Sequence, residues 1–259
     1  MNRKPLLLVA LVAMLALTLA AVALGSPNRK VWCAGNICIA DDGGISPEAL
    51  PKHGKAPVTA RLNGEVSTRD GSHPTPFKSM DLKIDKTISL DAEGLPVCHK
   101  GQIAASTTAT VKQVCGDAIV GSGEAEVEVA FPEQTPFRAT GPLVLFNGGV
   151  KGAVTTLLLH AYVNVPAPTA IVVKAKITKI HEGQFGMRIQ AEIPKIAGGA
   201  GSVTSFNLKI NKGIKSGGKT YNPLTAKCTD GKLQVHVLAK FADGTQAKTE
   251  IIRACTPEG

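Results

Sequence analysis

Aromatic side chains are scarce in this sequence, and its composition shows no bias toward a non-globular protein. Phe, Tyr and Trp make up 4% of the 259 residues, and charged residues make up 19%. The 27 Gly and 16 Pro are spread along the chain without a collagen period. This composition argues against a disordered chain, a collagen-like chain, a long coiled coil and a polytopic membrane protein. The length suffices for a hydrophobic core in one large domain or two small ones.

The sequence also lacks the local motifs of common enzyme classes. It has no G-x-S-x-G, no G-x-x-x-x-G-K-[ST], no H-E-x-x-H, and no S-x-x-K with its companion motifs. The C-x-x-C pairs that zinc sites normally show are absent. The glycine-rich stretch 198–202 precedes a strand pattern rather than a helix, so we interpret it as a loop. We predict no metal and no cofactor, although a Ser-His-Asp site can assemble from distant residues.

The N-terminus has the features of a secretory signal. Arg3 and Lys4 precede an uncharged apolar run from Leu6 to Leu24, and Ala21–Ala23 fits the small-x-small rule for signal peptidase. We predict a signal peptide over residues 1–25 and an exported protein, extracellular or at the cell surface. The alternative is an uncleaved anchor, because an apolar run of about 19 residues could span a bilayer core.

The net charge points to anionic partners. Removal of residues 1–25 takes away two basic residues and no acid, so the net charge falls from +9 to +7. A basic exported protein favours an anionic wall polymer, a lipid surface or a protein partner, while generic solubility explains the same charge without any partner. Because no three consecutive residues are Lys or Arg, the sequence predicts no specific nucleic-acid site.

The six cysteines suggest disulfides, since an even number in an exported chain is typical of them. Six thiols permit 15 pairings, but here they fall into three sequential pairs. We predict the bridges Cys33–Cys38, Cys98–Cys115 and Cys228–Cys255. Each of the two longer loops stabilises the fold by about 3 kcal/mol on the chain-entropy model.

Most of the chain after residue 57 alternates between apolar and polar residues, as half-buried strands do. The segments 124–131, 188–193 and 234–241 are the clearest cases. Asn63-Gly64, Gly121-Ser122-Gly123 and Asp243-Gly244 are typical of turns between such strands. One short helix is predicted from a Ser106 cap to about Cys115, with Gly116 as a left-handed terminator; a Thr-rich strand is the alternative.

An internal similarity suggests duplication. The stretch Phe77–Ile88 resembles Phe206–Ile214, and each copy is followed by two cysteines. The fold class predicted is therefore mainly β, with two antiparallel β-sandwich-like modules and a signal helix. The expected divisions are a signal peptide at 1–25, an irregular Cys-bearing lead segment at 26–56, a first module at 57–165 and a second at 170–259. Pro166 and Pro168 stiffen the chain at the proposed boundary.

One polar set inside an apolar strand is a candidate ligand contact. His160, Tyr162 and Asn164 would share one strand face. A polar stripe on the solvent face explains the same pattern without a ligand. The other histidines do not cluster in the sequence.

Several longer stretches carry a family resemblance, which covers roughly Pro57 to the C-terminus. The sequence resembles a family of exported actinobacterial proteins, a resemblance that implies no activity, ligand or catalytic residue. The stretches that carry it are Gly94–Cys98, Gly101–Ile103, Ala105–Thr107, Cys115–Gly123, Pro136–Phe137, Phe146–Gly148, His160–Tyr162, Phe241–Thr245 and Arg253–Cys255.

The sequence thus leaves several functions open. The first hypothesis is a secreted or cell-surface, disulfide-stabilised β protein that binds a partner or has a structural role, without catalysis. The alternatives are an extracellular hydrolase with a dispersed catalytic site and a carrier of a small apolar ligand. If His160 or His236 lies in a cleft within hydrogen-bond reach of both a Ser or Thr hydroxyl and a carboxylate, the hydrolase is favoured.

Overall fold

A computed structural model describes residues 29–165 and 167–259 of the chain. The signal peptide predicted for residues 1–25 lies outside these residues. Within them the chain is mainly β, as predicted, and its strands form one large antiparallel sheet and three small sheets. No helix in the described part of the chain is long and apolar enough to cross a membrane.

The large sheet contains twelve strands in the order β1-β2-β5-β13-β8-β9-β10-β11-β12-β6-β17-β18. In chain order these are β1 (Lys30–Ala34), β2 (Ile37–Ser46), β5 (Thr59–Thr68), β6 (Phe77–Asp85), β8 (Ile119–Val129), β9 (Phe137–Lys151), β10 (Val154–Val163), β11 (Thr169–Glu182), β12 (Phe185–Glu192), β13 (Gly201–Ile210), β17 (Lys232–Phe241) and β18 (Gln246–Ala254).

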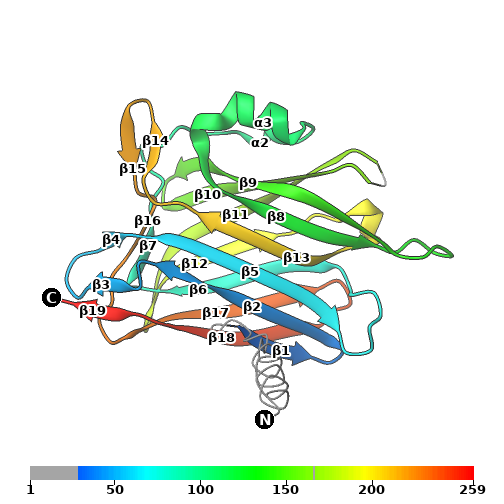
Figure 1. The fold of residues 1–259 in the computed structure, drawn as a ribbon, viewed down its shortest axis with the longest axis horizontal. Coiled ribbons are helices and arrows are strands. Elements are labelled where there is room, and N and C mark those ends of the chain that lie inside the picture. The colour runs from blue at the N-terminus through cyan, green and yellow to red at the C-terminus, as the bar shows by residue number, and fades with distance from the viewer. Residues whose placement is uncertain (1–28, 166) are drawn as a thin grey trace, which may run out of the picture.

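Short elements cover one end of this sheet (Figure 1). In the small sheets β16 pairs with both β4 and β7, β14 pairs with β15, and β19 pairs with β3. Their bounds, with those of the helices, are β3 (Ala49–Pro51), β4 (Ala56–Pro57), β7 (Ile88–Leu90), β14 (Ile214–Ser216), β15 (Lys219–Tyr221), β16 (Leu224–Ala226), β19 (Thr256–Glu258), α2 (Lys100–Ile103), α3 (Thr108–Cys115), η1 (Gly116–Ala118) and η2 (Ala197–Gly199).

The sheet curls around one main hydrophobic core. Ala60 on β5 and Ile210 on β13 share this core with Ile84 on β6 and Ile177 on β11. The curl brings the first and last strands of the order together, so that β1 lies beside β18 (Figure 1). Side chains bridge this seam, since the Lys30 ammonium donates to the carbonyl oxygen of Glu250.

The strands of the two predicted modules are interleaved, which corrects the expected pair of separate sandwiches. β13, from the second half of the chain, lies between β5 and β8, and β6 lies between β12 and β17. The proposed boundary is a connection within the sheet, because Val163 on β10 pairs with Thr169 on β11. Alternation of apolar and polar residues identifies a strand but not its neighbour, and this explains the error.

Two predicted turns are wrong for the same physical reason. Asn63 and Gly64 lie inside β5, where a Cβ on Gly64 would stand 2.4 Å from Cε1 of Phe206. Gly123 lies inside β8, where a Cβ would stand 1.9 Å from the carbonyl oxygen of Asn207. Glycine therefore permits close approach between strands at both positions. The turn predicted at Asp243-Gly244 is confirmed between β17 and β18.

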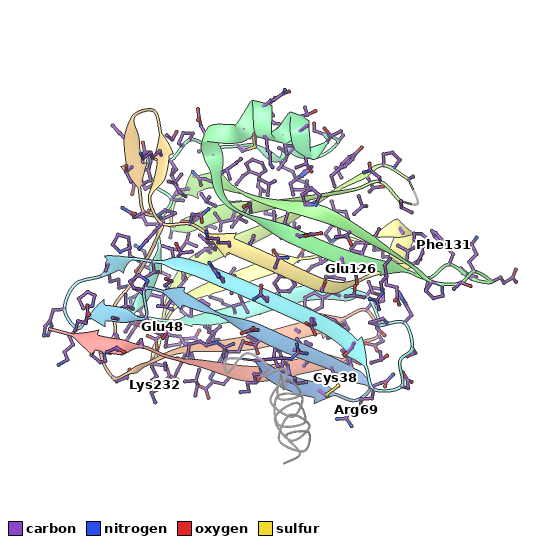
Figure 2. All side chains as sticks on the ribbon, in the orientation of Figure 1. Cys38, Glu48, Arg69, Glu126, Phe131 and Lys232 are labelled. Carbon is purple, nitrogen blue, oxygen red and sulfur yellow. A yellow bond between two sulfur atoms is a disulfide. The ribbon has the colours of Figure 1, made fainter. Side chains whose placement is uncertain are left out.

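The predicted lead segment is not irregular. From Lys30 it forms the β1–β2 hairpin and β3, and Cys33 lies directly opposite Cys38. Figure 2 shows the resulting disulfide at Cys38, near Arg69. The bridges Cys98–Cys115 and Cys228–Cys255 are also formed, so all three predicted disulfides are confirmed. These bridges fit an oxidising environment.

The predicted helix is confirmed as α3, but its ends differ. Thr107, rather than Ser106, caps it, and its hydroxyl oxygen accepts from the Thr110 N–H at 3.2 Å. Gly116 is right-handed, with φ −52°, and the chain continues into η1. Val111 and Cys115 face a core of Phe146 and its neighbours on β9 and β10, so α3 covers the outer face of the sheet there.

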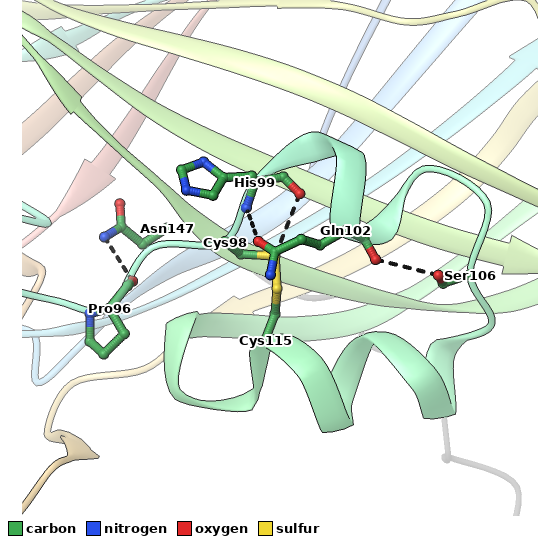
Figure 3. The surroundings of a disulfide bond; sticks show 7 residues. All are labelled: Pro96, Cys98, His99, Gln102, Ser106, Cys115 and Asn147. Carbon is green, nitrogen blue, oxygen red and sulfur yellow. Dashed lines mark hydrogen bonds between the residues drawn. A yellow bond between two sulfur atoms is a disulfide. The ribbon is translucent and has the colours of Figure 1, made fainter.

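A buried amide anchors the segment that leads to this helix (Figure 3). The side-chain amide of Asn147 donates to the carbonyl oxygens of Leu95 and Pro96, each at 3.1 Å, and its oxygen accepts from the Gly149 N–H at 2.9 Å. Cys98 follows directly and is bridged to α3. Asn147 is fully buried, so its hydrogen bonds fix this segment against β9.

Candidate functional site

Of the predicted set His160, Tyr162 and Asn164, only His160 contacts the connection between α2 and α3. His160 is completely buried, and its Nε2 lies 2.9 Å from the carbonyl oxygen of Ser106. Its Nδ1 has no hydrogen-bond partner among the described residues. Burial lowers the pKa of His160. Tyr162 is half-buried and Asn164 is exposed, so only His160 shares the interior with the helices.

A different histidine lies between a hydroxyl and a carboxylate. His73, in the connection between β5 and β6, places its Nε2 3.1 Å from Ser202 Oγ and its Nδ1 2.9 Å from Glu128 Oε1. Ser202 is the second residue of β13 and Glu128 is the last but one of β8, so three distant segments meet here. The hydrogen bond from His73 holds the pKa of Glu128 below its ordinary value, and Arg138 adds to the effect.

This Ser-His-Glu cluster has the connectivity of a catalytic triad, but its serine is engaged elsewhere. Ser202 is 1% exposed, and its hydroxyl also contacts the carbonyl oxygen of Pro74. A carbonyl oxygen only accepts, so the contact with Pro74 takes up the single hydroxyl proton of Ser202, which is then not available to His73. In this arrangement the cluster fastens the loop before β6 to β8 and β13.

A groove of about 500 Å³ opens on the outer face of the sheet, across β6, β12, β17 and β18. The Phe185 ring packs against His236 with 4.3 Å between ring centroids, which places the imidazole at this groove. The lining residues are Asp81, Lys83, Arg188, His236, Val237, Leu238, Lys248, Thr249 and Glu250.

The charges of the groove largely compensate one another. Arg188 forms an ion pair with Asp81, and Lys83 forms one with Glu182 at the end of β11. The hydrogen bonds from Arg188 lower the pKa of Asp81, and the same contact raises the pKa of Arg188. A ligand that carries only one sign of charge would have to compete with these internal pairs.

A stretch rich in lysine and without acidic residues contributes to a different part of the surface. From Ile193 to Thr229 the sequence contains six Lys and no Asp or Glu. Its exposed lysines continue from the end of β13 into the β14–β15 hairpin, which projects beside the helices (Figure 1). Together with the neighbouring arginine of β5 they form what we call the basic patch, which consists of Arg61, Lys209, Lys212, Lys215 and Lys219.

Local geometry holds the basic patch open to solvent. Arg61 lies directly opposite Lys209 across the β5–β13 ladder, an arrangement that is unfavourable for like charges. Among the described residues none of the five cations forms an ion pair. Gly217 and Gly218, with φ 54° and 74°, form the two-residue turn of the hairpin. Lys219 follows this turn directly, and Lys215, which pairs with Thr220, lies on the other face of the hairpin.

Neither the Ser-His-Glu cluster nor the basic patch was predicted from the sequence. The members of the Ser-His-Glu cluster are 55 and 74 positions apart along the chain, counted from His73 to Glu128 and from Glu128 to Ser202, so no local spacing reveals them. The basic patch could have been found, because the acid-free stretch 193–229 is visible in the sequence. A search for consecutive basic residues overlooks it, because other residues stand between the lysines along β13 and the β14–β15 hairpin.

Comparisons of this sequence and structure with protein-family models, curated proteins and solved structures find no match. In the described part of the chain no group of three or more His, Cys, Asp or Glu side chains is placed to hold a metal ion. The candidate sites therefore rest on their own geometry and charge.

Proposed function

We propose that the protein is an exported, non-catalytic binding protein that holds an anionic polymer, such as an acidic wall polymer, at the basic patch. The observation that carries the proposal is a set of five exposed cations without ion-pair partners among the described residues. Export is supported by the three disulfides and by the N-terminal sequence.

A polymer fits this surface better than a single small anion. The cations extend from the cross-strand pair Arg61–Lys209 along the chain into a projecting hairpin, so they present several separate contacts. A chain of repeated negative groups can occupy such contacts together, and each contact releases counterions. Arg61 supplies a planar donor fork and the lysines supply point charges, a combination suited to phosphate or carboxylate groups.

The test compares two charge-reversed variants. The double variant Lys215→Glu/Lys219→Glu reverses charge on the hairpin. Lys232→Glu/Lys240→Glu makes the same change on β17, where both lysines are exposed and have no ion pair among the described residues. We expect the hairpin variant to bind immobilised inorganic polyphosphate at least about tenfold more weakly than the wild type. The control variant should lose much less.

Polyglutamate and vesicles of anionic phospholipid serve as further probes. Binding to polyphosphate or polyglutamate supports a polymer ligand, whereas binding to vesicles alone overturns it. Equal loss of affinity in both charge-reversed variants would reduce the effect to net charge and would also overturn the site.

The Ser-His-Glu cluster favours one second function, an extracellular hydrolase in which Ser202 attacks an ester. The distances from His73 to Ser202 Oγ, 3.1 Å, and to Glu128 Oε1, 2.9 Å, support this function. The burial of Ser202 and its contact with Pro74 count against it. A fluorophosphonate probe decides between them. Labelling that disappears in Ser202→Ala supports the hydrolase, and an unlabelled wild-type protein removes it. The carrier of an apolar ligand stays a prediction.

A further inference from the structure

The sheet order repeats itself after six strands. With β1 beside β18, a shift by six positions carries β1, β2 and β5 onto β10, β11 and β12, and carries β13 onto β6. The same shift carries β8 and β9 onto β17 and β18. β6 belongs to the first half of the chain but lies among strands of the second half, and β13 does the reverse. If these two strands correspond, the shift preserves the order of the strands along the chain in each half.

The pairing registers agree with this correspondence residue by residue. Lys209 of β13 lies opposite Arg61, and Lys83 of β6 lies opposite Arg188. The next pairs along each ladder are Leu208 with Leu62, Asn207 with Asn63, Leu82 with Ile189, and Asp81 with Gln190.

A second sequence similarity appears once the registers are aligned. The stretch Ala60–Val66 reads ARLNGEV, and Met187–Ile193 reads MRIQAEI. Arg and Glu are identical at matching positions, and the remaining positions hold residues of similar size or type. The correspondence does not extend to every cysteine, because Cys115 precedes β8 whereas Cys255 follows β18.

The two matching Arg–Lys pairs lie on opposite outer faces of the curled sheet. They differ in whether carboxylates of the protein neutralise their positive charges. The residues beside them, Leu208 and Ile189, pack against the common core, so the cations point outward on both sides. Arg61 and Lys209 have no ion-pair partner among the described residues, but Arg188 pairs with Asp81 and Lys83 pairs with Glu182. The residue that corresponds to Asp81 in the other half is the uncharged Asn207.

We infer that the groove on β6 and β12 is a second copy of the anion site, occupied by two of the protein's own carboxylates. This inference rests on the function proposed for the basic patch. In the copy at Arg61 and Lys209 a polymer supplies the negative groups; in the copy at Arg188 and Lys83, Asp81 and Glu182 supply them. The substitution Asp81→Asn replaces one carboxylate oxygen by an NH2 group and removes the negative charge. It therefore makes the second copy resemble the first.

Titration with short-chain inorganic polyphosphate tests the inference through the number of binding sites. The wild type should bind one equivalent, and Asp81→Asn/Glu182→Gln should bind two. Glu182→Gln alone frees only Lys83, at an exposed position, and leaves the Arg188–Asp81 pair intact. This variant therefore measures the contribution of Lys83 to anion binding by itself. Adding Arg188→Gln to the double variant should return the number to one.

Each outcome separates this inference from the proposed function. A double variant that binds one equivalent, as the wild type does, overturns the second copy and leaves the basic patch in place. A wild type that binds nothing, beside a double variant that binds one equivalent, overturns the basic patch and supports the groove. Absence of binding in both proteins overturns both.

Discussion

Arg253 on β18 forms an ion pair with Asp41 on β2 and so joins strands that stand at opposite ends of the sheet order. Both side chains are largely buried, and Arg253 Nε also donates to the carbonyl oxygen of Gly43 at 2.7 Å. The seam beside β1 is therefore closed by side-chain contacts that reach past the edge strand.

Breaking this pair should destabilise the fold. Arg253→Met leaves the Asp41 carboxylate buried without its cation, and we expect a loss of about 3 kcal/mol in the free energy of unfolding. Arg253→Met/Asp41→Asn should recover much of that loss, because no buried charge is left alone. Urea unfolding of the four proteins in the cycle measures it. Strict additivity of the two changes would show that the pair does not close the seam.

Gly123 should tolerate no side chain. A methyl group there would overlap the carbonyl oxygen of Asn207, so Gly123→Ala should cost about 3 kcal/mol or more. Gly116→Ala is the matched control, since a Cβ at that position has no neighbour within 4 Å and φ is right-handed. Thermal unfolding compares the two variants. Equal stability would contradict the close approach of β8 to β13.

The Cys98–Cys115 bridge should matter more than the Cys33–Cys38 bridge. It closes a longer stretch of chain, so Cys98→Ala/Cys115→Ala should lose about 3 kcal/mol, against about 2 kcal/mol for Cys33→Ala/Cys38→Ala. Because the bridge ties α3 to the segment held by Asn147, amide exchange in α3 should also accelerate. Unchanged exchange in α3 would show that the disulfide does not hold this helix.

Acid should remove the stabilisation that Glu128 provides. The folded-state pKa of Glu128 is lowered, so its contribution is present above the unfolded value of about 4.3 and is lost as pH falls through the folded pKa. The advantage of the wild type over Glu128→Gln should therefore be larger at pH 7 than at pH 3. Denaturant unfolding at both pH values measures it. A constant advantage would contradict the assigned shift.

Asp41 should behave in the opposite direction. Burial raises its folded pKa despite Arg253, so the folded state binds this proton more tightly than the unfolded state does. Its contribution favours folding at low pH and is lost as pH rises from about 3.9 through the folded pKa. The stability of Asp41→Asn relative to the wild type should thus increase from pH 3 to pH 7, and a decrease over that range would refute the shift.

Local features of the fold could be predicted from the sequence, whereas its long-range pairing could not. Strands such as 188–193 show clear alternation, and sequential cysteines at short separations indicated their own bridges. The position of β13 between β5 and β8 depends on which sheet edges are available after folding, and alternation carries no information on that choice. Gly64 was mistaken for a turn because its role is set by Phe206, more than a hundred residues away in the sequence.

The candidate sites also differ in how far the sequence alone predicts them. Ser202, His73 and Glu128 meet only because β13 crosses to the first half of the chain, so their proximity is a product of the topology. The basic patch is mostly local, and the absence of acids over 193–229 records it directly. Its single distant member, Arg61, is added by the register of β5 against β13.

The salt dependence of polyphosphate binding tests the central claim most directly. If the basic patch holds a polyanion through several separate contacts, the association constant of the wild type should fall linearly on logarithmic axes, by about a hundredfold between roughly 50 and 200 mM salt. Lys215→Glu/Lys219→Glu should bind more weakly and with a shallower slope. Binding that is absent at low salt, or that is insensitive to salt in the wild type, would contradict the account.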